Sequence, residues 1–503
     1  MTQIELPAGV DASVDPSASD VELPSESEAL RKGALRGSAI TLIGYGVSSL
    51  IRFGSNLLIT RLLFPEQFGI MALVNVFVVG LQLFSDIGIG PNIIQSDRGD
   101  DPRFLNTAWT VQVSRGLILW IAACLVAWPL SRFYGRPQLT LLLPVTGFGA
   151  LIGGLESTRL FTQNRRLALG RVTALEVITQ VTGVVVMLTI AALTHSVWAL
   201  VFSSLASAAV KTTLSHTLLP GERNRFAWDP AARKTLFEFG RWIFFSTALA
   251  FLSGQSDRLI LGKLVSNATL GIYAIAVNLA ALPATIISQL SNRILYPITA
   301  AARRQGGKEW TSIRSNHSRL LLLLAPLVAM GVVLAPPAVS LLYRQPFWDV
   351  GPLAALLSIG TWLGAVSTSY TIVLMAAGAP RFLTFGSITK TVLFAILVFP
   401  VSARYGVSGV AILVSLSEIG FLIVAEIGGR TVGVVAWKVD LALTAFSVGY
   451  FFVSKTLYAL VLRFTHGARI PSILVVLSLT LALTGALAKR SKLLGGRAGP
   501  ARR

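Results

Sequence analysis

Apolar runs of about 20 residues recur along almost the whole chain, and each is long enough to cross the hydrocarbon core of a membrane. Only 13% of the residues are charged, whereas a soluble domain usually carries about a quarter. The pattern predicts an all-α integral membrane protein with about fourteen transmembrane helices. The expected spans lie near 37–63, 68–92, 107–130, 139–160, 172–193, 196–219, 238–262, 271–296, 318–343, 352–376, 383–403, 407–428, 440–463 and 470–488.

The basic residues lie in short loops between the apolar runs, and alternate loops differ strongly in their content. One set of loops, with both tails, holds roughly 27 lysines and arginines, against roughly 8 in the other set. Cytoplasmic loops collect such residues, so we expect both termini in the cytoplasm and an even number of spans. The net charge of +20 is therefore assigned to membrane topology, and no nucleic-acid partner is expected.

Other functional classes find little support in the residues. Residues 1–30 carry seven acids and no lysine or arginine, which is typical of a disordered tail and unlike a signal peptide. Cys124 is the single cysteine and the four histidines are scattered, so neither a disulfide nor a metal site is expected. The outward loops, such as 193–196, are too short to hold a catalytic domain. We expect no enzyme activity and no cofactor.

A weak internal repeat relates the two halves of the chain. Residues 55–63 with 68–70 are similar to 256–264 with 270–272, at an offset of about 201 residues that spans six helices. Six is even, so the copies have the same orientation and predict two parallel-related six-helix lobes plus two C-terminal helices. The expected organisation is an acidic tail (1–35), an N-lobe (36–220), a linker (221–237), a C-lobe (238–430), two further helices (431–488) and a basic tail (489–503).

Two stretches resemble a known family. Residues 60–70 (TRLLFPEQFGI), continuing to 82–90 (QLFSDIGIG), resemble the first helix pair of Wzx-type polysaccharide flippases of the multidrug/oligosaccharidyl-lipid/polysaccharide superfamily. Residues 257–262 (DRLILG) are similar to the seventh helix of that family. The resemblance implies a V-shaped, MATE-like carrier in a bacterial inner membrane. It would export an undecaprenyl-diphosphate-linked oligosaccharide by alternating access, among membrane lipids and beside the pathway's polymerase and chain-length regulator.

A polar stripe in the first helix supplies the leading candidate for a binding residue. Thr41, Tyr45, Ser48, Arg52 and Ser55 follow helical spacing, so one face of an otherwise apolar helix cannot contact lipid. Arg52 lies near mid-depth, where an ionisable group costs about 2.5–3.5 kcal/mol on insertion scales and needs a partner or a function. It is interpreted as a cavity residue, with a structural ion pair as the alternative. Ser48 and, in the same helix, Asn56 are assigned to the same substrate-binding set.

Four further cations fall within the predicted spans: Arg115, Arg258, Arg293 and Lys390. The guanidinium fork donates two parallel hydrogen bonds to phosphate oxygens, which suits a diphosphate ligand. These residues are therefore predicted to bind the head group. The alternatives are that Arg293 and Lys390 extend to the membrane surface and that Arg258 belongs to a packing network.

Two acids are candidates for ion coupling or gating. Asp86, at the end of the second span, is expected either to pair with Arg115 or to couple protons. Asp257 shares a helix face with Ser253 and Gly254 and is a gate or coupling candidate. Two rival functions stay open: a cation-coupled multidrug exporter of the same superfamily, and an integral-membrane glycosyltransferase or polymerase.

Overall fold

The computed structural model of the chain describes residues 44, 46–85, 88–166, 168–283, 310–433, 437–465 and 467–495. Two candidate site residues, Asp86 and Arg293, lie outside these ranges. Within the described residues the regular structure is helical, and no strand occurs. The all-α prediction is confirmed.

The N-terminal helices, which we call the N-lobe, begin with a helix over residues 46–62. Its labelled members are α2 (Pro65–Phe84), α3 (Ile89–Gln95), α4 (Pro102–Tyr134), α5 (Leu139–Gly154), α6 (Arg159–Arg165), α7 (Leu169–Thr194) and α8 (Trp198–Thr217). The boundaries of α4 follow from its sequence. The Asp101 carboxylate accepts a hydrogen bond from the Arg103 N–H, Pro102 occupies the first turn, and Gly135 ends the helix in the left-handed conformation.

The C-terminal helices are α9 (Pro230–Leu264), α10 (Asn267–Ala280), α13 (Trp310–Leu342), the short η2 (Gln345–Phe347), α14 (Val350–Ala376), α15 (Arg381–Thr431), α16 (Trp437–Phe464) and α17 (Arg469–Gly495). We call those from α9 to α15 the C-lobe. A straight helix of 51 residues would be about 75 Å long, far more than a membrane needs. The chain instead breaks within α15 at Gly406, where φ is 59° and ψ is −151°. Two of the predicted spans therefore form α15.

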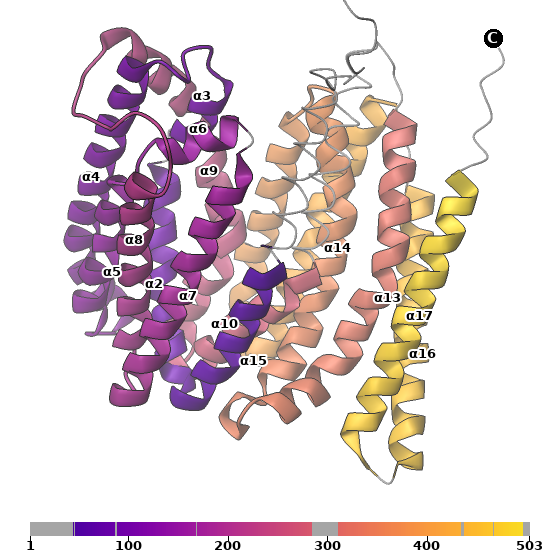
Figure 1. The fold of residues 1–503 in the computed structure, drawn as a ribbon. Helices are drawn as coiled ribbons and strands as arrows, with labels where there is room; N and C mark the ends of the chain where they lie inside the picture. The colour runs from indigo at the N-terminus through magenta and orange to yellow at the C-terminus, as the bar shows by residue number, and fades with distance from the viewer. Residues whose placement is uncertain are drawn as a thin grey trace, which may run out of the picture.

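The two lobes stand side by side, with α16 and α17 packed on the side of the C-lobe that faces away from the N-lobe (Figure 1). Among the described residues, eight helices are long and apolar enough to cross a membrane, or nine if the bent pair α5–α6 counts as one span. The chain is a multi-pass membrane protein. The expected total of about fourteen spans stays a prediction.

We name the two ends of the bundle by what lies there. The α3 end carries α3, α6 and residues 218–229, and the Pro65 end carries the starts of α2 and α10.

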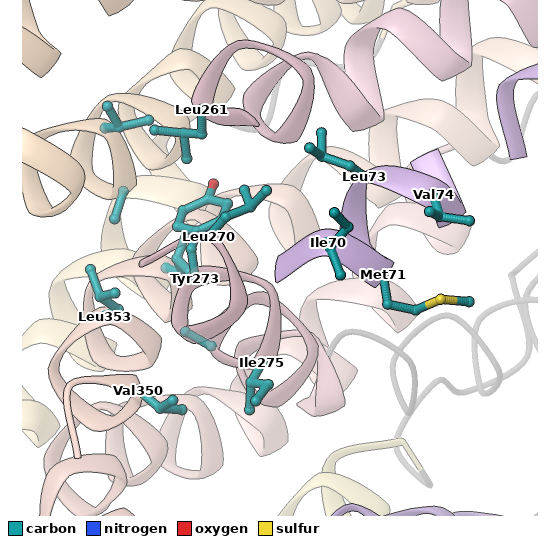
Figure 2. Close-up of a cluster of buried hydrophobic side chains, with 14 of the residues drawn as sticks. Ile70, Met71, Leu73, Val74, Leu261, Leu270, Tyr273, Ile275, Val350 and Leu353 are labelled. Carbon is teal, nitrogen blue, oxygen red and sulfur yellow. The ribbon is translucent and has the colours of Figure 1, made fainter. Parts of the chain in front are cut away.

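At the Pro65 end the two lobes share one apolar core. Ile70 and Leu73 of α2 lie there with Leu270 and Tyr273 of α10 and with Val350 (Figure 2). Lipid is as apolar as these side chains, so close van der Waals packing across this core joins the lobes.

The start of α2 crosses the start of α10 with pseudo-twofold symmetry. A Cβ on Gly69 would lie 1.8 Å from the Asn267 carbonyl oxygen, and a Cβ on Gly271 would lie 2.0 Å from the Pro65 carbonyl oxygen. In sequence, Gly69 precedes Gly271 by the same interval as Pro65 precedes Asn267. Such a reciprocal contact is the isologous type that a twofold axis produces. Residues that the internal repeat makes equivalent therefore meet across this crossing.

Candidate functional site: two polar cavities beside the α2–α9 contact

A polar cavity of about 600 Å³ lies inside the N-lobe, among α2, α4, α5 and α8. Arg115 projects from α4 into its wall, where Nε donates to Ser85 Oγ at 2.9 Å and Nη2 donates to the Gln82 carbonyl at 2.7 Å. Lys211 of α8 lies on the same wall and pairs with Glu156 at 2.9 Å. Among the described residues, the cavity thus presents two cations and one carboxylate within a bundle of apolar helices.

A buried amide holds one side of this cavity in place. Gln112, one turn before Arg115 on α4, donates through Nε2 to the carbonyls of Gly154 and Glu156 at 3.1 and 3.0 Å. The last carbonyls of a helix have no partner within the helix, so this amide satisfies the end of α5. The contact fixes the depth of Arg115 relative to Glu156.

A second polar cavity of about 400 Å³ lies inside the C-lobe, among α9, α10, α14 and α15. Lys390 and Glu418, on opposite sides of the break in α15, form an ion pair in its wall, with side chains 20% and 18% exposed. Asp257 of α9 is buried and accepts a hydrogen bond from Tyr273 Oη at 2.7 Å. Thr361 and Thr368 of α14 add hydroxyl groups.

The contact between α2 and α9 separates the two cavities. Phe84 and Phe251 pack edge to face with ring centroids 5.3 Å apart, and Thr247 Oγ1 donates to the Leu83 carbonyl at 2.8 Å. Gly80 makes room for the Phe251 ring, which a Cβ at that position would approach to 2.8 Å. Leu83 lines one cavity, and Ser253 and its neighbours on α9 line the other. A ligand moving between the cavities would have to part these helices.

A third, apolar hollow of about 350 Å³ opens where the first helix meets the C-lobe. Phe53 of the first helix lines it together with Leu279 of α10 and with Leu327, Met330 and Leu334 of α13. Hydrocarbon side chains supply nearly all of its surface, so it suits an apolar ligand.

The predicted site residues are divided between these places. Arg115 lies in the N-lobe cavity, and Lys390 and Asp257 lie in the C-lobe cavity. Arg258 lines neither of them and donates to Gln255 Oε1 at 2.8 Å. Arg52 is exposed on the first helix; its carbonyl accepts a hydrogen bond from Ser55 Oγ at 3.0 Å, and its guanidinium has no hydrogen-bond or ion-pair partner among the described residues.

Ser48 and Asn56 are partly buried on the first helix. The Ser48 carbonyl accepts a hydrogen bond from Gln180 Nε2 at 2.8 Å, which ties this helix to α7. Sequence reasoning missed Lys211 and Gln112 as cavity residues. A signal existed for Lys211, because it is the single charged residue in the apolar stretch 196–219. The sequence holds no such signal for Gln112, because the role of Gln112 depends on the position of α5.

The fold and these cavities define a class: a two-lobed, polytopic carrier with polar hollows in each lobe. Two solved structures share this fold. The lipid II flippase MurJ, in an inward closed conformation, superposes with a TM-score of 0.64 at 11% identity, covering 91% of this chain and 100% of that one. An inward-facing multidrug resistance MATE family transporter of the MOP superfamily gives 0.58 at 14% identity, covering 76% and 94%.

The chain belongs to the polysaccharide biosynthesis protein family, whose model matches residues 58–351, more than half of the 503 residues. The resemblance read from the sequence is therefore confirmed. The lipopolysaccharide biosynthesis protein WzxC of Escherichia coli (strain K12) is 21% identical over 71% of each chain. The chain matches as little as 62% of the length of a curated relative, which is less than two thirds.

Proposed function

We propose that this protein flips a lipid-linked anionic oligosaccharide, of the undecaprenyl-diphosphate type, from the cytoplasmic to the periplasmic leaflet of a bacterial inner membrane. The observation that carries the proposal is the half-buried Arg115 guanidinium in a cavity of about 600 Å³. A planar guanidinium recognises phosphate oxygens through paired hydrogen bonds and stays charged among apolar helices. Family membership and the flippase fold of MurJ support the same reading.

The head group and the tail need different surroundings, and the chain offers both. Arg115, with Lys211 beside it, suits the diphosphate, and the exposed Arg52 suits an early encounter with it. The apolar hollow lined by Phe53, next to Arg52 in the chain, suits the isoprenoid tail. Arg258 and Arg293, with Ser48 and Asn56, remain predicted contacts of the head group. Ser85 and Gln82 hold Arg115 in place in the cavity wall.

The α3 end is proposed to face the cytoplasm, with both termini on that side, because it carries the basic loops. The Pro65 end then faces the periplasm, where the shared core and the α2–α10 crossing hold the lobes together. The structure would thus represent a state that is closed to the periplasm. Opening there requires this crossing to separate.

The membrane potential is sufficient as an energy source in principle. Moving one charge is worth about 2.3 kcal/mol per 100 mV, and the inside is negative, so an anion leaves downhill. Asp257 remains a proposed gate or coupling residue, and Asp86 a second one. The C-lobe cavity holds two carboxylates, Asp257 and Glu418, which is the observation that favours the alternative of a cation-coupled multidrug exporter.

The proposal is tested by polymer export in a strain lacking the gene, with the polymerase and chain-length regulator as proposed partners left in place. Arg115→Gln and Arg52→Ala are expected to abolish export while the protein remains in the membrane at normal amounts. Arg171→Gln, an exposed arginine at the start of α7, serves as the matched control. Full export by Arg115→Gln would refute the cavity assignment, and drug resistance without polymer export would favour the exporter.

A further inference from the structure

The segment that joins the lobes, residues 218–229, is bound along the α3 end of the N-lobe, and we call it the strap. Arg159, which is 9% exposed, holds its first half. The guanidinium donates to the carbonyls of His216, Leu219 and Glu222 at 2.6, 3.1 and 2.9 Å. Asn224 is tied to Ser157 at 2.6 Å. The first part of the linker predicted at 221–237 is thus bonded to the N-lobe.

The second half of the strap runs along the first turns of α4 in an extended course. Alternate backbone N–H groups donate to α4 side chains: Arg225 to Asn106 at 2.9 Å, Ala227 to Thr110 at 3.1 Å and Asp229 to Thr107 at 3.0 Å. Alternate N–H groups of an extended chain point to the same side, so one edge of the strap is bonded to α4.

The strap lies at the level of the lipid headgroups. A helix of 33 residues such as α4 is about 50 Å long, whereas the hydrocarbon core is about 30 Å thick. Roughly 10 Å at each end therefore projects into the headgroup region, and Asn106 and Thr107 lie within the first two turns. The strap is bonded to those turns.

The exposed side chains of the strap combine cations with aromatic rings. Arg223 and Arg225 are exposed, Phe226 is 69% exposed and Trp228 is 54% exposed. Phe226 rests against Trp109 of α4, with ring centroids 4.8 Å apart. Aromatic side chains beside arginine are the composition that proteins place at the interface between lipid and water.

Three nearby aspartates, Asp100, Asp101 and Asp229, are already paired with other arginines. Arg98 pairs with Asp101 and Asp229 at 2.7 and 2.8 Å, and Arg166 pairs with Asp100 at 2.7 Å. Arg223 and Arg225 have no anionic partner among the described residues. Their charge is available to an external anion.

We infer that the strap is a binding surface for the headgroups of anionic phospholipids, which would hold the junction between the lobes on the membrane surface. The phosphate groups pair with Arg223 and Arg225, and Phe226 inserts at the acyl boundary. An acidic protein partner would bind the arginines, but it would not account for the exposed Phe226 ring at the depth of the headgroups. The inference concerns bulk lipid and is independent of the transported substrate.

The test is native mass spectrometry of the full-length protein with added phosphatidylglycerol or phosphatidylcholine. Each basic residue near an anionic surface contributes about 1 kcal/mol, and 1.4 kcal/mol is tenfold. Arg223→Gln with Arg225→Gln should therefore weaken phosphatidylglycerol binding roughly 30-fold, while the paired lysine variant retains most of it. Phosphatidylcholine should bind weakly to every variant.

Arg171→Gln is the matched control, since Arg171 is exposed on the same lobe but off the strap. Equal loss in this control, or unchanged binding in the double glutamine variant, would overturn the inference. Amide hydrogen exchange of residues 225–229 should be the same in the double variant and the wild type. Faster exchange would show that these arginines hold the strap to the protein, which also contradicts the proposal.

Discussion

Adding one methyl group at the α2–α10 crossing should open the Pro65 end of the protein. In Gly69→Ala the new Cβ would lie 1.8 Å from the Asn267 carbonyl oxygen, whereas ordinary contact begins at 3.4 Å. The helices must therefore separate by about 1.6 Å. The obstacle is backbone, so no change of rotamer relieves it. Overpacking of this kind costs about 1–3 kcal/mol, which shifts the balance between closed and open states roughly 5- to 150-fold.

Distances between two spin labels measure this opening. Glu66 of α2 and Leu264 of α9 are both exposed at the Pro65 end and are suitable for cysteine labelling after Cys124 is replaced. The parent protein should give one short distance. Gly69→Ala should add a longer population, and Gly271→Ala should do the same, because its Cβ would meet the Pro65 carbonyl at 2.0 Å.

The control is Gly54→Ala, in the first helix, where an added Cβ meets nothing within 4 Å. It should leave the distance unchanged and slightly stabilise its helix. If Gly69→Ala and Gly271→Ala kept the parental distance and the parental thermal stability, the reasoning that this crossing closes the Pro65 end would be refuted.

Three further predictions concern charges. Lys390→Met should lower the free energy of unfolding by about 1–3 kcal/mol because it leaves the half-buried Glu418 carboxylate unpaired, and adding Glu418→Leu should restore the thermal midpoint; unchanged stability in the single variant would contradict the ion pair. Arg159→Gln should lower the free energy of unfolding by about 3 kcal/mol and speed amide exchange in residues 218–229, because three carbonyls lose a charged donor. Unchanged protection of these amides would contradict the role of Arg159. Hydrogen bonds from the Arg98 side chain and then from the Arg103 N–H hold the pKa of Asp101 below its usual range. The stabilising contribution of Asp101 is therefore present above about pH 4 and is lost as the pH falls further. Asp101→Asn should show a smaller fall in thermal midpoint below pH 4 than the wild type, and identical acid profiles would contradict this.

The sequence predicted the class of fold because a membrane leaves few choices. Every spanning segment must satisfy its own backbone hydrogen bonds, so apolar runs of about 20 residues become helices. The internal repeat also carried spatial information, since Gly69 and Gly271 meet at the crossing of equivalent helices.

The site was harder to predict because its geometry depends on how helices rotate and pack. Periodicity placed Arg115 and Lys390 within spans. For Arg115 the sequence suggested Asp86 as a partner, which lies outside the described residues, and for Lys390 it suggested none. In the structure Arg115 donates to Ser85, and Lys390 pairs with a glutamate on the other side of the break at Gly406. Of the predicted cations, Arg115 and Lys390 line two different cavities, with a helix contact between them.

The central claim is most directly tested by transport in reconstituted vesicles. A fluorescent undecaprenyl-diphosphate oligosaccharide is placed in both leaflets, and a quencher that cannot cross the membrane reports which molecules reach the outer leaflet. The wild-type protein should let the quencher reach nearly all of the label within minutes, and Arg115→Gln should behave like protein-free vesicles. Quenching that stops at half with the wild-type protein, under an imposed potential of either sign, would contradict the claim.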